Sequence, residues 1–152
     1  MRTVGLEYPV VLEPDEDTVL LTFPDVPQAV TFGEDEDEAL AHGVDALITI
    51  MWAMMNDAED IPMPSKPKPG QPTVALPPLV ASKILLYNTM REEGVSKAEL
   101  ARRLGNKAPT HVTRLLDLTH KSRHDQLDEA MAVLNHRLVV SAEPLPPMRR
   151  SA

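Results

Sequence analysis

Residues 96–116 have the sequence SKAELARRLGNKAPTHVTRLL, and this stretch decides the organisation of the C-terminal half of the chain. Ser96 is a favourable N-cap for a first short helix, and Pro109 is a favourable first residue for a second one. Gly105 lies between the two predicted helices, where a tight turn is needed, and the small side chain of Ala101 allows the helices to cross closely. Two short helices joined in this way are typical of a helix-turn-helix, which places its second helix in the major groove of DNA.

The second predicted helix leaves a polar face free to meet DNA. Arginine pairs with guanine in the major groove, and threonine contacts a base or the thymine methyl group, whereas lysine and arginine beside the helix suit phosphates. The side chains predicted to face the bases are Thr110, His111, Thr113, Arg114 and Asp117. The side chains predicted to contact phosphates are Arg102, Arg103, Lys107, Lys121 and Arg123. The alternative interpretation is a small helical unit whose basic face is only solvated, because helical hairpins with glycine turns are common.

Two more helices flank this pair, so residues 78–140 are predicted to form an all-α DNA-binding domain. The helix before the pair starts at a proline pair and ends at Gly94, a favourable C-terminal residue. The helix after the pair is predicted to have Ser122 as its N-cap. Residues 141–152 hold three prolines and are predicted to form a frayed tail.

Residues 1–76 are predicted to form a β-β-β-α-β domain. The predicted strands are residues 4–12, 18–23 and 29–32, with a turn at 13–17 and a candidate fourth strand at 74–76. A helix is predicted from an N-cap at Asp35 to about Asn56, because apolar residues recur there at three- and four-residue spacing. One helix covers only one face of such a sheet, so the opposite face needs a partner or stays wet.

Proline marks the boundary between the two predicted domains. Seven of the 15 prolines lie between residues 61 and 78. Because proline has no amide donor and a fixed φ, residues 61–73 are predicted to form an extended loop. The fold class that follows is α+β, with a small antiparallel sheet and its helix preceding an all-α domain.

The net charge of −8 hides a split between the two halves of the chain. Residues 1–65 hold one basic and 15 acidic residues, a net charge of −14. Residues 66–152 hold 14 basic and 8 acidic residues, a net charge of +6. Such asymmetry predicts two partners, a basic one for the acidic half and nucleic acid for the basic half.

The composition also excludes several classes of protein. Without cysteine there is no disulfide, no thiolate zinc site and no cysteine nucleophile. No run of about 18 apolar residues predicts a membrane span, and the N-terminal residues do not form the apolar core of a signal peptide. We therefore expect a cytoplasmic protein with no membrane partner.

The chain resembles the HicB antitoxins of bacterial HicA–HicB toxin–antitoxin systems from Tyr8 to about Leu138. The first matching stretch, YPVVLEPDEDTVLLTFPDVPQAVTFGEDEDEAL, has a hairpin, an FPD-x-P sequence, a T-x-G strand end and an acidic helix start. The second, LPPLVASKILLYNTMREEGVSKAELARRLG, is similar to the subfamily that ends in a Cro-type helix-turn-helix. The chain departs from the family between Gly105 and Val112, where it is one residue longer, so the pairing of side chains with bases stays open.

The resemblance implies a fold, partners and a function. HicB proteins bind and silence HicA, a small basic ribonuclease that cleaves mRNA, and they repress their own operon by binding operator DNA. The resemblance further implies a truncated RNase H-like fold for the N-terminal domain and assembly as dimers or tetramers. Tryptophan is enriched in binding hot spots, although on an amphipathic helix it more often lies in the core. The residues predicted to contact the toxin are Phe23, Pro24, Asp25, Pro27 and Trp52.

Three alternatives remain at this stage. A metal-dependent nuclease needs acidic residues that converge from separate strands, whereas here they cluster at 13–17 and 34–38, so we expect no enzymatic activity. His120 and His124 have the spacing of zinc ligands on one helix, but an N-cap at Ser122 would separate them, so we expect no metal or cofactor. The third alternative is a helix-turn-helix regulator whose N-terminal domain senses a ligand or another protein.

Overall fold

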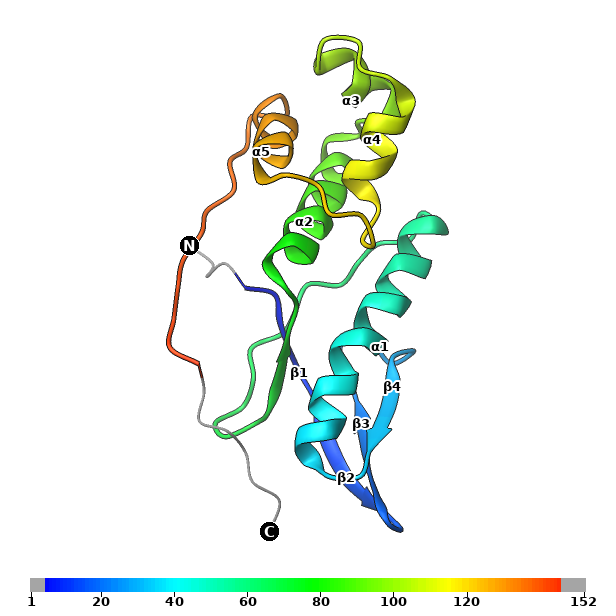
Figure 1. Cartoon of the computed structure of the whole chain (residues 1–152), viewed down its shortest axis with the longest axis vertical. Helices are drawn as coiled ribbons and strands as arrows, with labels where there is room; N and C mark the ends of the chain where they lie inside the picture. The colour runs from blue at the N-terminus through cyan, green and yellow to red at the C-terminus, as the bar shows by residue number, and fades with distance from the viewer. Residues whose placement is uncertain (1–4, 146–152) are drawn as a thin grey trace. The chain divides into compact units, whose positions relative to one another are not determined.

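The computed structural model describes residues 5–145 and divides this part of the chain into two compact units. The first unit contains residues 5–76 together with residues 141–145, and the second is Pro77–Val140. The first holds small antiparallel sheets and one long helix, and the second holds four helices, which confirms the predicted α+β class (Figure 1). Within residues 5–145, no helix combines the length and apolar character needed to cross a membrane.

The strands of the first unit form two antiparallel sheets (Figure 1). Strand β1 (Glu7–Pro9) pairs with β5 (Thr73–Ala75), so the candidate strand within the proline-rich region is confirmed and begins one residue earlier than predicted. The other sheet has the order β2–β3–β4. Its strands are β2 (Val11–Asp15), β3 (Thr18–Thr22) and β4 (Val30–Gly33).

Two details of the predicted strands are wrong. The single strand at 4–12 is interrupted at Val10, whose N–H donates to the carbonyl of Pro72 (3.0 Å) at the point where the chain changes from one sheet to the other. Val4 lies outside the described residues. The turn at 13–17 is also shorter than predicted, because β2 continues to Asp15 and only two residues connect it to β3. Glu16 takes the left-handed backbone conformation (φ 54°) that such a tight turn needs.

Helix α1 (Glu36–Asn56) is the only helix of the first unit among the described residues. The Asp35 carboxylate accepts a hydrogen bond from the N–H of Glu38 (2.8 Å), which confirms the predicted N-cap. The helix packs on the sheet through one face, and Leu21 of β3 is fully buried beneath it. The buried residues of α1 are Ala39, Gly43, Leu47, Met51, Met54 and Met55.

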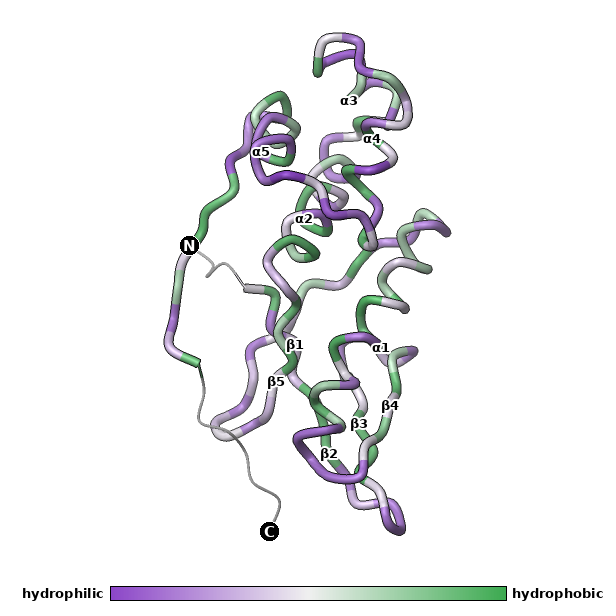
Figure 2. The backbone as a smooth tube through the Cα atoms, in the orientation of Figure 1, coloured by the Kyte–Doolittle hydropathy of each residue, from purple (hydrophilic) through white to green (hydrophobic). Residues whose placement is uncertain are grey.

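The second unit contains helices α2 (Pro78–Glu93), α3 (Lys97–Arg103), α4 (Pro109–Leu116) and α5 (His124–Ala132). Gly94 ends α2 in the left-handed conformation (φ 67°), and Pro109 is the first residue of α4, as predicted. Figure 2 shows green, hydrophobic positions alternating with purple ones along these helices. The core residues of the unit include Ile84, Leu86, Leu100, Val112, Leu115, Leu127 and Leu134.

The predicted N-cap of the last helix is wrong. Helix α5 begins at His124 with Arg123 at its cap position and no side-chain cap hydrogen bond. Ser122 is buried instead, and its hydroxyl accepts a hydrogen bond from the Lys83 ammonium (2.9 Å) and donates one to the carbonyl of Arg114 (3.2 Å). The Ser122 hydroxyl, which the sequence pattern assigned to the start of the helix, is therefore a hydrogen-bond partner of the buried Lys83 ammonium.

We expect Gly33→Ala to lower the stability of the first unit by about 1–3 kcal/mol, because overpacking forces the backbone to move. A Cβ atom on Gly33 would lie 2.8 Å from the Cα atom of Ala39 in the first turn of α1. Urea unfolding followed by the fluorescence of Trp52, the single tryptophan, measures the change in this unit. Gly5→Ala is the control, since a Cβ there meets no atom within 4 Å. Equal midpoints for the two variants would contradict this explanation.

Candidate DNA-binding and partner-binding surfaces

Helices α3 and α4 are joined by a short turn that is closed by backbone hydrogen bonds. Ser96 caps α3 by accepting a hydrogen bond from the N–H of Glu99 (3.1 Å). Gly105 (φ 85°) and Asn106 (φ 60°) both take the left-handed conformation, which glycine and asparagine tolerate best. The N–H of Lys107 then donates to the carbonyl of Ala101 (3.0 Å). The two successive left-handed residues reverse the chain between the helices.

The structure brings the predicted base-facing residues together on α4. Thr110, Thr113 and Arg114 are exposed, whereas His111 is half-buried, and Asp117 is half-buried at the C-cap. The opposite side of α4 is apolar, and its buried residues are Val112, Leu115 and Leu116. Lys107 in the turn before α4 and Lys121 in the loop after it are both exposed. One short helix thus presents a polar face with a lysine near each end.

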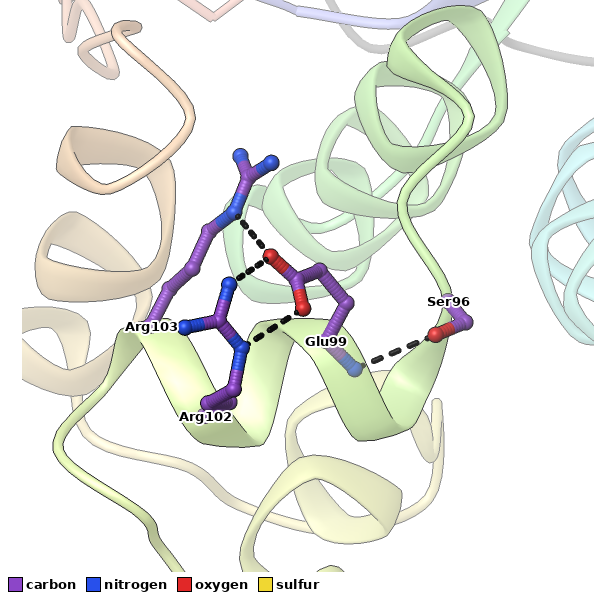
Figure 3. Close-up of polar contacts among 4 residues, drawn as sticks. All are labelled: Ser96, Glu99, Arg102 and Arg103. Carbon is purple, nitrogen blue, oxygen red and sulfur yellow. Dashed lines mark hydrogen bonds and ion pairs between the residues drawn. The ribbon is translucent and has the colours of Figure 1, made fainter.

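The carboxylate of Glu99 binds both arginines that were predicted to contact phosphates (Figure 3). Arg102 Nε donates to Oε2 of Glu99 (2.9 Å), and Arg103 Nε donates to Oε1 (3.0 Å). These hydrogen bonds lower the pKa of Glu99 to about 2. Both guanidinium groups remain exposed at the surface, and the Glu99 carboxylate neutralises part of their charge.

The remaining predicted phosphate contact, Arg123, is also paired. It lies beside Asp125, with 3.1 Å between Arg123 Nη2 and Asp125 Oδ2, and both side chains are largely exposed. His120 lies in the loop before α5, and His124 is the first residue of that helix, so the two histidines occupy different elements as predicted. Within residues 5–145, no cluster of three metal-ligating side chains is present.

The predicted partner-binding loop of the first unit is partly buried. Phe23 is 1% exposed and packs in the core, whereas Pro24 and Pro27 are exposed. The carboxylate of Asp25 accepts hydrogen bonds from the backbone N–H (2.8 Å) and the hydroxyl (2.9 Å) of Ser65. Trp52 is half-buried on α1. Any partner at this loop would therefore meet the two prolines and not the ring of Phe23.

The sequence predicted an uncovered sheet face opposite α1, but the apolar residues exposed on that face were not identified. Val30 and Phe32 of β4 are 52% and 61% exposed. Their register partners on β3 are Thr22 and Leu20, and residues directly opposite in an antiparallel pair face the same side. These four residues define what we call the open sheet face. The signal in the sequence was the run Val30-Thr31-Phe32 before Gly33. Alternate residues of a strand face the same side, so Val30 and Phe32 both point away from α1.

A groove of about 390 Å³ lies beside this face, between β4 and α1. Its lining includes Gln28, Val30, Thr31, His42, Asp45 and Thr49. His42 Nδ1 lies 2.8 Å from the carbonyl oxygen of Phe32, so the ring bridges the helix and the strand. Strand β4 is at the edge of its sheet, where unpaired backbone groups favour contact with another chain.

Comparison with known proteins identifies the family. A family model for HicB-like antitoxins of bacterial toxin–antitoxin systems matches residues 7–85. Antitoxin HicB 1 of Photorhabdus laumondii is 39% identical over 140 residues, which cover 91% of this chain and 88% of the relative. The chain belongs to the HicB family of antitoxins. Antitoxin HicB of Escherichia coli K12 is 37% identical (88% of this chain, 96% of the relative), and that of Pseudomonas fluorescens is 34% identical (93% and 97%).

Membership of the HicB family confirms the resemblance found in the sequence. The family model covers all five strands and α1, and the matched residues include all 15 acidic residues of the N-terminal half. The matches to the relatives leave at most 18 residues of this chain uncovered, so they also include α3 and α4. These relatives are named as antitoxins, a class of protein in line with the predicted lack of enzymatic activity.

Glu99→Gln is expected to tighten binding to any DNA duplex, because it removes the carboxylate that neutralises Arg102 and Arg103. Exposed ion pairs are weak, so affinity for random duplex at low salt is expected to rise only modestly, by roughly fivefold at most. Fluorescence anisotropy over a salt series measures the affinity of each variant for the random duplex. Glu129→Gln, which removes the same charge from an exposed position on α5, is the control. Equal gains in the two variants would mean that only net charge matters.

Proposed function

We propose that this HicB antitoxin neutralises a HicA-like ribonuclease with its first unit and represses its own operon with its second. The observation that supports this most strongly is the family match together with relatives that cover about nine tenths of the chain. The charge split agrees with it, since a basic toxin suits the acidic half and DNA suits the basic half. Both activities concern mRNA and genomic DNA, so we place the protein in the cytoplasm.

The proposed DNA contact is a helix-turn-helix formed by α3 and α4. The polar face of α4 carries Thr110, Thr113 and Arg114 at exposed positions, and these side chains suit base edges in the major groove. Arg102 and Arg103 on α3, with Lys107 and Lys121 beside α4, suit phosphates. A dimer or tetramer would place two such motifs on half-sites about one helical turn apart in a palindromic operator.

Arg114→Ala is expected to lower affinity for the operator by about 1–3 kcal/mol, the size of one bidentate base contact. Fluorescence anisotropy with the operator and with a random duplex of equal length separates the two kinds of contact. Arg137→Ala, which removes an exposed arginine beyond the end of α5, is the control. An equal loss of affinity on both duplexes would show that Arg114 contacts only phosphate.

The proposed toxin contact lies on the first unit, around the loop before β4 and the open sheet face. Residues 1–65 carry a net charge of −14, which attracts a basic protein and disfavours a second copy of this acidic unit. Figure 2 shows the tube in purple at the β2–β3 turn and at the start of α1, where acidic residues gather. Aromatic residues exposed on such a surface are typical anchors of binding energy. The proposed contact residues are Pro24, Asp25, Pro27, Val30, Phe32 and Trp52.

Phe32→Ser is expected to weaken binding of a HicA-like toxin by about 2 kcal/mol or more, the loss that defines a hot spot. Calorimetry with the purified toxin, carrying an inactivating substitution, measures the affinity. Val139→Ser, which removes a 42% exposed apolar side chain from the second unit, is the control. If the Phe32 variant binds the toxin with unchanged affinity and has an unchanged unfolding midpoint by Trp52 fluorescence, the toxin does not bind at the open sheet face.

A further inference from the structure

Lys83 is fully buried in the helical unit, at 0% exposure, although lysine is one of the residues least often found inside a protein. It lies in the middle of α2. Its ammonium nitrogen donates to three backbone carbonyls, those of Arg114 (2.8 Å), Asp117 (2.7 Å) and His120 (2.7 Å). A fourth hydrogen bond goes to the hydroxyl of Ser122 (2.9 Å). The four acceptors are 31 to 39 residues away in sequence.

The acceptors belong to the end of α4 and the loop that follows it. The last carbonyls of a helix have no partner within the helix, and a positive charge near them is favourable. Arg114 lies in the last turn of α4, and Asp117 is its C-cap residue. Lys83 therefore caps α4 from a different helix, and it also holds the loop that leads to α5.

The cap depends on the positive charge and the shape of the side chain. A buried ammonium is costly unless each of its protons has an acceptor, and here four oxygen atoms surround three protons. Burial lowers the pKa of Lys83 to about 8, and the neighbouring Asp117 carboxylate opposes that shift. An apolar side chain of similar length would fill the space but leave the carbonyl oxygens at the end of α4 without this donor.

We infer that Lys83 is a positioning residue for the DNA-reading helix, one that sets how α4 presents its polar face without touching DNA. The main chain of Arg114 is one of the groups that Lys83 holds, so the origin of that exposed side chain is fixed from inside the unit. The loop it holds carries Lys121, a proposed phosphate contact, next to Ser122. This inference rests on the proposed DNA binding, because it explains how the side chains proposed to contact DNA are held in position.

The test compares full-length Lys83→Met with Leu86→Ala, a matched control on the same helix. Leu86 is also fully buried on α2, so its truncation destabilises the unit, but it donates to none of the acceptors of Lys83. For Lys83→Met we expect affinity for the operator to fall roughly tenfold, the size of one lost base contact, with little change on random duplex. For Leu86→Ala, measured where both variants are folded, we expect the ratio of the two affinities to stay as in the wild type. Equal ratios in the two variants would overturn the inference.

A second measurement on the DNA-free protein keeps the two proposals distinguishable. The N–H of His120 donates to Asp117 and that of Ser122 donates to His120, so amide hydrogen exchange at these positions reports on the loop that Lys83 holds. We expect exchange there to be faster in Lys83→Met than in Leu86→Ala, and equal exchange would overturn the inference. A wild type that binds operator and random duplex equally would instead refute the proposed function.

If Lys83→Met does not fold, Ser122→Ala provides the test. This substitution removes one of the four acceptors and keeps the ammonium with its three carbonyls. We expect a smaller loss of operator affinity, roughly twofold to fivefold, which corresponds to one net hydrogen bond of ordinary strength, and again little change on random duplex. Unchanged discrimination between the duplexes would overturn the inference.

Discussion

The Lys83 ammonium joins parts of the helical unit that are far apart in sequence. It lies on α2, and its hydrogen bonds reach the last turn of α4 and the loop that precedes α5. The short helices α3 and α4 have seven and eight residues, which is too short for either to be stable alone in water. Helix α4 packs against α2, and α3 packs against α4, so the arrangement of both helices depends on these contacts and on the cation that holds the end of α4. The cost of burying the charge is offset because four oxygen atoms accept hydrogen bonds from the ammonium.

The N-terminal unit has a different constraint, which is that a single helix covers a sheet with two faces. Helix α1 buries Leu21, and Gly33 and Gly43 allow the backbones and side chains to approach closely. The opposite side of the sheet keeps Phe32 and Val30 in contact with water. Exposed apolar residues on an edge strand are a liability for a monomer, and a surface of this kind is retained where a partner covers it.

Much of the fold was predictable because its signals are local. The caps at Asp35 and Ser96, the helix end at Gly94 and the helix start at Pro109 depend on residues within one turn of the helix, and all four are confirmed. The role of Ser122 was not predictable from such a pattern, because its partner is 39 residues away. The break at Val10 likewise depends on a hydrogen bond to Pro72, which no local pattern reveals.

The candidate surfaces were also predictable only where the signal is local in the sequence. The polar face of α4 follows from helical periodicity once the turn at Gly105 is recognised, so the side chains proposed to read bases were found together. The pairing of Glu99 with Arg102 and Arg103 also follows from three- and four-residue spacing, although the sequence analysis assigned both arginines to phosphates alone. Phe23 was misjudged because a residue at a strand end faces inward or outward according to register, and here it faces the core.

The opposite charges of the two halves stay distinct because electrostatic interactions are short-ranged in salt. At physiological ionic strength the potential of exposed charges decays over about 8 Å, so a basic helix face interacts with phosphates largely through the charges beside it. The net charge of the whole chain therefore does not by itself set the potential at the proposed DNA contact. The local positive potential there comes from Lys107, Arg114 and Lys121 together with the arginines of α3. The carboxylate of Glu99 lowers this local positive charge, because it binds Arg102 and Arg103 directly.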